Sequence, residues 1–438
     1  MDVADFIKSD LSRRQFLGKS AQNAAGVAAG MVGLSGAVAQ ASPGERVRLG
    51  VLGIRNQGEK LATSLAGFAD VDVTTVCDVD QNVVPEALKS IEAAQGFAPN
   101  TETDFRRVLD DESIDAVVIA TPDHWHAVMA VMACQAGKDV YVEKPVSHNI
   151  AEGRAMIAAA DQYDRIVQSG LQQRSGSHFQ SAIEYVAGGK LGRVNLAKAW
   201  TVHRRKPVGS KKNERIPQGV DYDLWLGPAA QADFNPNRFH YNWRWFWEFG
   251  GGELGNWGVH MLDIARWGLN VELPTRISAS GGKYCFRDQE TPDTLVAQFE
   301  FPDNEANSKT IVWEHRQWSD HGIEGRSAAA AFYGENGTLI VDRGGWKVYD
   351  QKQPATSNSS ELARAHQRNF IDCIKTRQTP VADLEIGHIS STLCHLCNIA
   401  YKLGREVNFD PTNENFGTDA EANTLLLRDY REPWTIEV

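Results

Sequence analysis

Three groups of residues in this sequence have side chains suited to binding a nucleotide or to moving a proton. The first is the run Gly53-Ile54-Arg55-Asn56-Gln57-Gly58 together with Asp78, and the second is Lys144. The third is Asn256, His260 and Asp263, whose i, i+4 and i+7 spacing places all three on one face if residues 254–268 form a helix. Glycines before a helix bring backbone N–H groups close to phosphates, while an amine and an imidazole stabilise or take up charge near neutral pH.

The first group lies where a dinucleotide-binding unit would place it. An apolar, β-prone run over residues 46–53 precedes a predicted helix and a second β-branched run that ends at Asp78. Gly53 allows a sharp turn off the strand, and Gly58 allows the helix to pack closely on the sheet. The helix N-terminus then faces the pyrophosphate, and Asp78 accepts hydrogen bonds from the ribose hydroxyls, which favours NAD over NADP.

One position departs from the dinucleotide fingerprint, because Arg55 stands where a second glycine is expected. The backbone there approaches the pyrophosphate less closely, although the guanidinium can itself bind a phosphate and so leaves NADP open. We expect Arg55, Asn56 and Gln57 to contact the cofactor. The alternative is an α/β sheet that binds no cofactor.

Two further apolar runs end in polar residues at the same edge of the predicted sheet. Residues 116–120 lead into Thr121-Pro122-Asp123-His124-Trp125-His126, and residues 140–142 lead into Glu143-Lys144-Pro145. Ligands gather at the carboxyl ends of parallel strands, so both ends point toward the nucleotide crevice. For Lys144 the alternative is a surface lysine at the end of a strand.

By its motifs the chain resembles the Gfo/Idh/MocA oxidoreductases, which include glucose–fructose oxidoreductase and inositol dehydrogenase. The resemblance covers about residues 46–410 and is carried by GVLGIRNQG (50–58), ATPDHWH (120–126), VEKP (142–145) and GGGELGNWGVHMLD (250–263). It implies an α/β protein with an N-terminal Rossmann domain and a C-terminal α/β domain that has an open, largely antiparallel sheet. It also implies that a sugar binds between the domains, over the nicotinamide.

The resemblance adds cofactor contacts at the two strand ends. It implies that the loop 121–126 lines the nicotinamide ribose, with contacts from Thr121, Pro122, His124 and His126. Glu143 and Lys144 complete the expected set. No metal is expected, because the two histidines lack a carboxylate pair that would support a site.

Oxidation of a carbinol needs a group that stabilises charge on the oxygen and a base that takes the proton. We expect Lys144 to be the first, since burial near a cationic nicotinamide would lower its pKa. By the resemblance, His260 corresponds to the family's catalytic histidine, and Asp263 to a carboxylate that contacts substrate or orients that histidine. Asn256 stands where many relatives have Asp, and an amide cannot accept a proton at neutral pH. We therefore expect His260 to be the base and Asn256 to bind a sugar hydroxyl; the alternative is a satisfied core histidine.

Residues 239–249 (FHYNWRWFWEF) are rich in aromatic side chains. Alternate positions from Tyr241 to Trp247 are aromatic, which predicts an extended strand with one face free to stack on a pyranose. We expect Trp243 and Arg244 to reach the substrate. For the other aromatic residues, sheet core or a subunit interface is the alternative.

The remaining sequence predicts the domain plan. Strand-type alternation dominates from Val194 onward, and two predicted helices close the second domain. The plan has a signal peptide over 1–41, a Rossmann domain over 46–166, a substrate-binding and oligomerisation domain over 167–410, and a C-terminal tail over 411–438. We expect a homo-oligomer, a dimer or a tetramer, in which the tail could wrap another subunit.

The N-terminus has the layout of a twin-arginine export signal. Residues 12–17 (SRRQFL) precede an uncharged stretch rich in Ala and Gly, with small-residue cleavage motifs at its end. A membrane anchor and a disordered tail are the alternatives. Export of a folded protein through this pathway would place the enzyme in the periplasm, with its cofactor acquired beforehand and tightly bound.

Composition limits the classes of partner and of cysteine chemistry that this protein can have. The net charge of −11 and the lack of a long Lys/Arg run exclude nucleic acid as a partner. Cys394-His395-Leu396-Cys397 has the spacing of a redox or metal pair, but its helical context favours core packing.

Taken with the resemblance, these features predict NAD(P)-dependent hydride transfer at a carbinol of a sugar, glycoside or polyol. Two alternatives stay open: redox-neutral glycoside cleavage that uses tightly bound NAD through a transient keto-sugar, and a non-catalytic sugar-binding protein.

Overall fold

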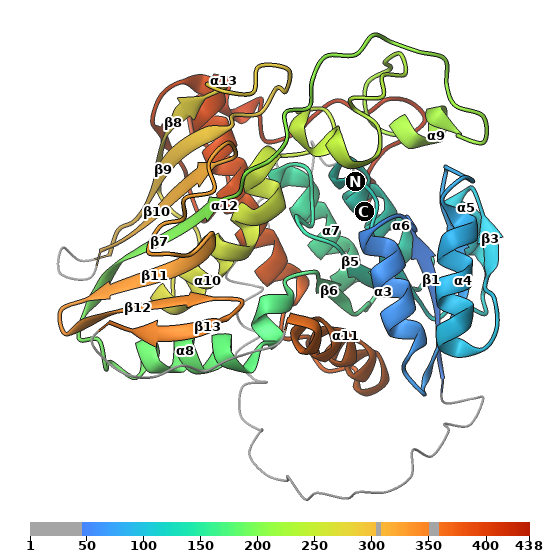
Figure 1. The fold of residues 1–438 in the computed structure, drawn as a ribbon, viewed down its shortest axis with the longest axis horizontal. Helices are drawn as coiled ribbons and strands as arrows, with labels where there is room; N and C mark the ends of the chain where they lie inside the picture. Colours follow the sequence, from blue (N-terminus) through green and yellow to red (C-terminus); the bar gives the residue numbers. More distant parts are fainter. Residues whose placement is uncertain (1–45, 304–307, 350–358) are drawn as a thin grey trace, which may run out of the picture.

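The computed structural model describes residues 46–303, 308–349 and 359–438 (Figure 1). The predicted export signal lies outside these residues. Within them, no helix combines the length and the apolar character needed to cross a membrane.

The N-terminal domain is built on a six-stranded parallel sheet in the order β3-β2-β1-β4-β5-β6. The strands are β1 (Val47–Leu52), β2 (Val71–Cys77), β3 (Asn100–Glu102), β4 (Ala116–Ile119), β5 (Asp139–Val142) and β6 (Val167–Ser169). All residues of β4 and β5 are buried, because helices cover both faces of the sheet. This order is that of a doubly wound dinucleotide fold, so the predicted Rossmann domain is confirmed.

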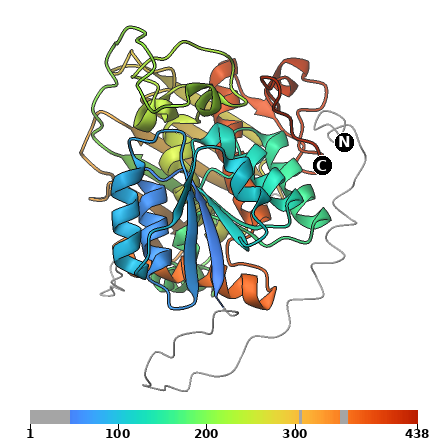
Figure 2. The same ribbon diagram turned by 90° about the vertical axis from the view of Figure 1, so that its right-hand side faces the viewer.

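Helices flank the two faces of this sheet (Figures 1 and 2). One face packs against α3 (Gln57–Ala66), α4 (Val84–Gln95) and α11 (Ser359–Thr376). The other face packs against α5 (Phe105–Asp110), α6 (Asp123–Gln135) and α7 (Ile150–Gln162). Helix α11 comes from the C-terminal part of the chain, so the second domain reaches back to cover the first.

The C-terminal domain is built on an eight-stranded sheet in the order β13-β12-β11-β7-β10-β9-β8-β14. Its strands are β7 (Val194–Val202), β8 (Arg276–Gly282), β9 (Thr294–Phe301), β10 (Lys309–Arg316), β11 (Ala328–Gly334), β12 (Gly337–Asp342), β13 (Gly345–Val348) and β14 (Val407–Asn408). Among the described residues of this second sheet, only the pairing of β10 with β7 is parallel. The predicted open, largely antiparallel sheet is therefore confirmed.

One face of this sheet is covered by helices. Helices α8 (Ser177–Ala187), α10 (Val259–Leu269) and α12 (Leu384–Leu403) contribute to the same core cluster as the inward side chains of the strands. Strand β9 accordingly alternates buried and less buried residues, as a sheet with one covered face requires.

The aromatic segment 239–249 is not a strand, so that prediction was wrong. Residues His240–Trp245 form a short 3₁₀ helix, η3. Trp245, Phe246 and Phe249 are all buried in one aromatic cluster, together with residues of α9 (Tyr222–Leu226). Neighbouring residues that face the same core cannot follow the two-residue period of a strand, so packing overrides the alternation.

The helix predicted over residues 254–268 is divided into two parts. Leu254–Gly258 form a π-helical turn, η4, and the α-helix α10 begins only at Val259. A π turn changes the angular spacing of side chains, so Asn256 is out of phase with His260 and Asp263.

The C-terminal tail packs on the first domain of its own chain. The Trp434 ring lies 4.7 Å from the Trp125 ring and 5.9 Å from the Phe105 ring, between centroids. Arg428 forms an ion pair with the buried Glu152 at 3.0 Å. The tail and α11 therefore hold the two domains together from opposite faces of the Rossmann sheet.

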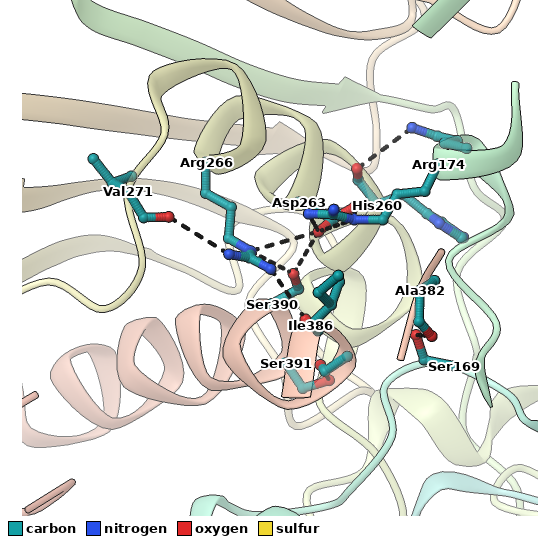
Figure 3. A network of polar contacts seen from close by, with 12 residues as sticks. Ser169, Arg174, His260, Asp263, Arg266, Val271, Ala382, Ile386, Ser390 and Ser391 are labelled. Carbon is teal, nitrogen blue, oxygen red and sulfur yellow. Dashed lines mark hydrogen bonds and ion pairs between the residues drawn. The ribbon is translucent and has the colours of Figure 1, made fainter. Parts of the chain in front are cut away.

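A buried polar network fastens α10 to two other helices (Figure 3). The Asp263 carboxylate accepts hydrogen bonds from Arg174 Nε and Nη2 at 2.8 Å, and from Ser390 Oγ at 2.6 Å. Arg266 Nε lies 3.5 Å from the same carboxylate and donates to Ser390 Oγ at 2.9 Å. Arg174 belongs to the 3₁₀ helix η2 (Gln172–Ser175) and Ser390 to α12, so one carboxylate links three elements.

Asp263→Asn is expected to lower the free energy of unfolding by about 3–5 kcal/mol, because it leaves Arg174 buried without its counter-charge. Chemical denaturation measures the loss. The matched control is Glu335→Gln, whose pair with Arg193 is 57% exposed on both sides and should contribute less than about 1 kcal/mol. Normal stability combined with weakened substrate binding would instead support a substrate-contacting role for Asp263.

Candidate functional site

A cleft of about 1210 Å³, including the solvent space at its mouth, lies between the two domains. One wall consists of the loops that follow β1, β2, β4 and β5. The other wall consists of residues from α9, η3 and the π turn η4. This is the crevice at the carboxyl ends of the parallel strands, where ligands of doubly wound sheets bind.

The glycine turn after β1 is as tight as the sequence predicts. Gly53 has a φ of 82°, and a Cβ there would lie 2.9 Å from the backbone oxygen of Ala120. A Cβ on Gly58 would lie 1.8 Å from the backbone oxygen of Gly53. Only glycine fits at either position, and the turn delivers the N-terminus of α3 to the cleft beside Arg55, Asn56 and Gln57.

Asp78 lies at the end of β2 and lines the cleft. Its carboxylate accepts the N–H of Ile54 at 2.8 Å and the N–H of Asp80 at 2.9 Å. Burial raises the pKa of Asp78 to about 6, while the nearby Arg55 guanidinium acts in the opposite direction. A carboxylate can accept about four hydrogen bonds, so it keeps capacity for a ligand's hydroxyl groups.

A segment of the second domain closes over the loop after β2. The Gln81 N–H donates to the backbone oxygen of Gly219 at 2.9 Å, and His240 Nε2 lies 3.0 Å from Asp80 Oδ2. Asp80 also forms a β-bridge with Val220. We call residues 217–221 together with His240 the roof of the cleft. Sequence reasoning missed it, because its partners are more than a hundred residues apart.

Glu143 and Lys144 line the cleft directly after β5, and we call this part of the cleft its floor. Lys144 Nζ donates to the backbone oxygen of Asn256 in the π turn at 3.0 Å, across the domain boundary. Glu143 Oε1 accepts from Gln57 Nε2 at 2.9 Å. Burial lowers the pKa of Lys144, and the carboxylates of Glu143 and Asp123 partly offset that effect.

The two histidines in the first turn of α6, which follows β4, lie in different places. His126 lines the cleft beside Thr121 and Pro122, and its two ring nitrogens lie 2.7 Å from the backbone oxygen of Pro145 and 2.9 Å from that of Thr121. It thereby ties the two strand-end loops together. His124 is fully buried behind the wall, bonded to the backbone oxygen of Trp225 at 3.1 Å, and burial lowers its pKa to about 3.

The structure does not bring Asn256, His260 and Asp263 to one surface. Asn256 lines the cleft, and its Nδ2 donates to Glu253 Oε2 at 3.3 Å. The Asp263 carboxylate bonds Arg174 and Ser390 instead of reaching the cleft. The π turn accounts for this separation.

His260 is 4% exposed and is not among the residues that line the cleft. Its ring packs 6.0 Å from the ring of Trp257, and its Nδ1 has no hydrogen-bond partner. Burial holds the pKa of His260 well below its usual value, and the charges of Arg343 and Lys144 act in the same direction. The imidazole is therefore neutral near pH 7 and resists protonation.

The predicted substrate residues Trp243 and Arg244 both line the cleft. The Arg244 guanidinium lies 4.5 Å from the Trp243 ring centroid and 4.2 Å from that of Tyr241. Cation–π contacts of this kind hold a guanidinium flat against aromatic rings. The 3₁₀ helix thus presents these side chains to the cleft in place of the predicted strand.

Two polar residues near this site were not singled out by sequence reasoning. Asp123 is 4% exposed and lines the cleft. Arg343, in the turn between β12 and β13, lies 4.5 Å over the Trp257 ring and donates to Gln173 Oε1 at 3.2 Å. Ligands gather at the carboxyl ends of parallel strands, and this rule, which selected Thr121 and Pro122, also applies to Asp123. Nothing in the sequence around Arg343 indicates a functional role.

Metal and thiol chemistry have little support at this site. Among the described residues, no group of three or more His, Cys, Asp or Glu side chains could hold a metal ion. Cys394 and Cys397 are buried free thiols, and burial raises the pKa of both.

Two family models match this chain. Residues 47–171 match the Gfo/Idh/MocA oxidoreductase family's NAD-binding Rossmann fold. Residues 197–282 and 344–436 match the family's C-terminal alpha/beta domain. Together the matches span well over half of the chain.

Curated relatives match over part of their length. A glycosyl hydrolase family 109 protein of Saccharopolyspora erythraea is 28% identical over 259 residues, which cover 51% of this chain and 55% of that protein. A levoglucosan dehydrogenase of Pseudarthrobacter phenanthrenivorans is 26% identical over 220 residues, covering 46% and 48%. The chain thus spans about half the length of the curated relatives it matches.

Solved structures share the fold. The WlbA dehydrogenase from Bordetella pertussis, in complex with NADH and UDP-GlcNAcA, aligns with a TM-score of 0.64 and 21% identity, over 83% of this chain and 99% of that one. One assignment follows from three observations: the two family models match in the expected order, the first sheet has the strand order of a dinucleotide fold, and a glycine turn lies at its crevice. The chain belongs to the Gfo/Idh/MocA family of oxidoreductases, and its first domain is that family's NAD-binding Rossmann domain.

Proposed function

We propose that this protein transfers a hydride between NAD and a carbinol carbon of a sugar, glycoside or polyol. The observation that carries the proposal is the position of Lys144, whose ammonium group reaches the second domain inside the cleft of an NAD-binding fold. A buried ammonium beside a carbinol oxygen stabilises the negative charge that develops as the hydride leaves.

The residues at the crevice fit a dinucleotide. Gly53 and Gly58 leave the backbone open to a pyrophosphate, and Asp78 keeps acceptor capacity for ribose hydroxyls. The Arg55 guanidinium lies near Asp78 and favours its charged form. Its positive charge would attract a 2′-phosphate that the Asp78 carboxylate repels, so NADP stays open. When bound, the oxidised nicotinamide supplies the acceptor for the hydride.

The other wall suits a sugar. Trp243 offers an aromatic face for pyranose C–H groups, and Arg244 and Asn256 offer donors for hydroxyl groups. His240 of the roof also lines the cleft, and desolvation by a bound substrate would strengthen the electrostatic interactions there.

Redox-neutral glycoside cleavage is the second candidate. It is favoured by the relatives described as glycosyl hydrolase family 109 proteins. The contacts of the roof with the loop after β2 would also slow the exchange of a nucleotide bound beneath them. Export through the twin-arginine pathway to the periplasm, inferred from residues 12–17, fits either reaction if the cofactor is acquired before export. A homo-oligomer is likewise part of the proposal.

A three-part experiment separates the candidates. Mass spectrometry of any nucleotide released on denaturation tests for a bound cofactor, and its absence favours a sugar-binding protein. Persistent absorbance of reduced nicotinamide after a sugar is added supports a dehydrogenase. Cleavage of a nitrophenyl glycoside without persistent reduction supports the redox-neutral reaction.

Lys144→Ala is expected to lower kcat about 10²–10³-fold with little change in bound nucleotide, because it removes the charge that stabilises the reacting oxygen. Steady-state kinetics and nucleotide content measure the two effects. Lys60→Ala, an exposed change on α3, is the control. Near-normal turnover of the Lys144 variant would remove this residue from the mechanism.

The affinity for NAD is expected to fall as the pH drops through about 6, the raised pKa of Asp78. Above that pH the carboxylate is ionised and accepts strong hydrogen bonds from ribose hydroxyls; below it, protonation removes that capacity. Calorimetric titration of nucleotide-stripped protein measures the trend. Asp78→Asn should bind weakly at high pH and lose the pH dependence, and a wild-type affinity that does not vary with pH would contradict the assignment.

A further inference from the structure

Hydride transfer from a carbinol also releases the hydroxyl proton, and this inference, which rests on the proposed function, concerns where that proton goes. Three groups at this place are poor acceptors. Asn256 carries an amide, and the Lys144 amine already donates to a backbone oxygen. His260 is not among the residues that line the cleft, and its protonation would add a third positive charge beside Arg343 and Lys144.

Asp123 provides a carboxylate at the same place. It is the first residue of α6, at the carboxyl end of β4, and it lines the cleft together with Lys144 and Asn256. Its Oδ2 lies 3.4 Å from the position that a Cβ on Gly255 would occupy. The carboxylate therefore lies beside the backbone of Gly255, the residue that precedes Asn256.

The groups around Asp123 leave it free to accept a proton. Lys144, Arg244 and Cys394 face it from the loop after β5, from η3 and from α12. The backbone N–H groups of Gly251 and of Asp123 itself favour the charged form of this carboxyl group. Within the described part of the chain, neither Lys144 nor Arg244 forms an ion pair with it, so the remaining lone pairs are available to a substrate hydroxyl.

We propose that Asp123 is the catalytic proton acceptor, a carboxylate on the Rossmann domain that does the work Asn256 cannot do. The O–H bond of the carbinol breaks and its proton passes to the Asp123 carboxylate. The electron pair of that bond forms the second bond of the C=O group. The C–H bond breaks, and its hydrogen leaves with both electrons as a hydride, for which bound NAD would supply the acceptor. In the reverse direction the Asp123 carboxyl group returns the proton.

The balance of charge and burial agrees with this role. Burial raises the pKa of Asp123 to about 7, although Lys144 and Arg244 oppose the shift. A base is most effective when its pKa lies near the working pH. A purely structural role at the N-terminus of α6 predicts that Asn, which has the same shape, substitutes without loss.

The test uses the nucleotide-loaded protein and its variant Asp123→Asn. In the wild type, single-turnover hydride transfer should rise with pH to a plateau, with a midpoint near the carboxyl pKa of about 7. The variant should keep its nucleotide, lose about 10²–10⁴-fold in rate and lose that rise. Formate should partly restore the rate of Asp123→Ala, because it supplies the missing carboxylate.

A second readout does not depend on turnover. Infrared difference spectroscopy of the resting protein should show a carboxyl group that titrates near pH 7 in the wild type and is absent in Asp123→Asn. His260→Gln should keep both the infrared signal and the pH rise. Loss of the rise in His260→Gln, with its retention in Asp123→Asn, would overturn the proposal in favour of the histidine. Absence of hydride transfer in the wild type with every sugar, beside a normal infrared titration, would instead count against the proposed function.

Discussion

The hydrogen bond from Lys144 Nζ to the backbone oxygen of Asn256 joins the two domains inside the cleft, and the geometry of the site depends on it. The ammonium comes from a strand end of the Rossmann sheet, and the carbonyl from a π turn of the second domain. π turns of this kind are often found at functional sites, because they alter the direction of side chains within an otherwise regular helix. Here the turn directs Asn256 toward the cleft and separates it from Asp263.

Contacts elsewhere in the fold hold the two domains in the relative position that this hydrogen bond requires. Helix α11 belongs to the C-terminal part of the chain but packs on the first sheet through Phe370 and Ile371. Arg377 adds an ion pair to Asp139 at 2.6 Å. On the opposite face, Trp434 packs against Trp125 on α6, the helix that begins with Asp123. The position of the cleft is thus set by contacts well away from it.

Sequence patterns were sufficient for the parts of the site that follow from local rules. The glycine turn, Asp78 and the strand-end residues Thr121 and Lys144 all follow from the order strand, turn, helix and from the gathering of ligands at strand ends. The same rule applies to Asp123, which was overlooked beside two histidines. His124 proved to be a core residue because its neighbours include Trp225, which lies 101 positions away and has no local signal.

Other features depend on partners that are distant in the sequence. The resemblance implied that Asp263 contacts substrate or orients His260, and the spacing of a regular helix would place the two on one face. The pairing of Asp263 with Arg174 involves a residue 89 positions away, which no spacing rule could identify. The strand predicted around Trp243 was wrong for a related reason. The conformation of this segment is determined by its packing against α9 and not by the alternation of its aromatic residues.

The roof gives the cleft a kinetic property as well as a shape. Its backbone bond between Gln81 and Gly219 and its contact between His240 and Asp80 link the two domains beside the loop that holds Asp78. If a dinucleotide binds beneath these contacts, its release requires them to open, and the free energy of that local opening contributes to its residence time. Affinity and exchange rate are thereby uncoupled, and a moderate equilibrium constant becomes compatible with many catalytic cycles on one bound molecule.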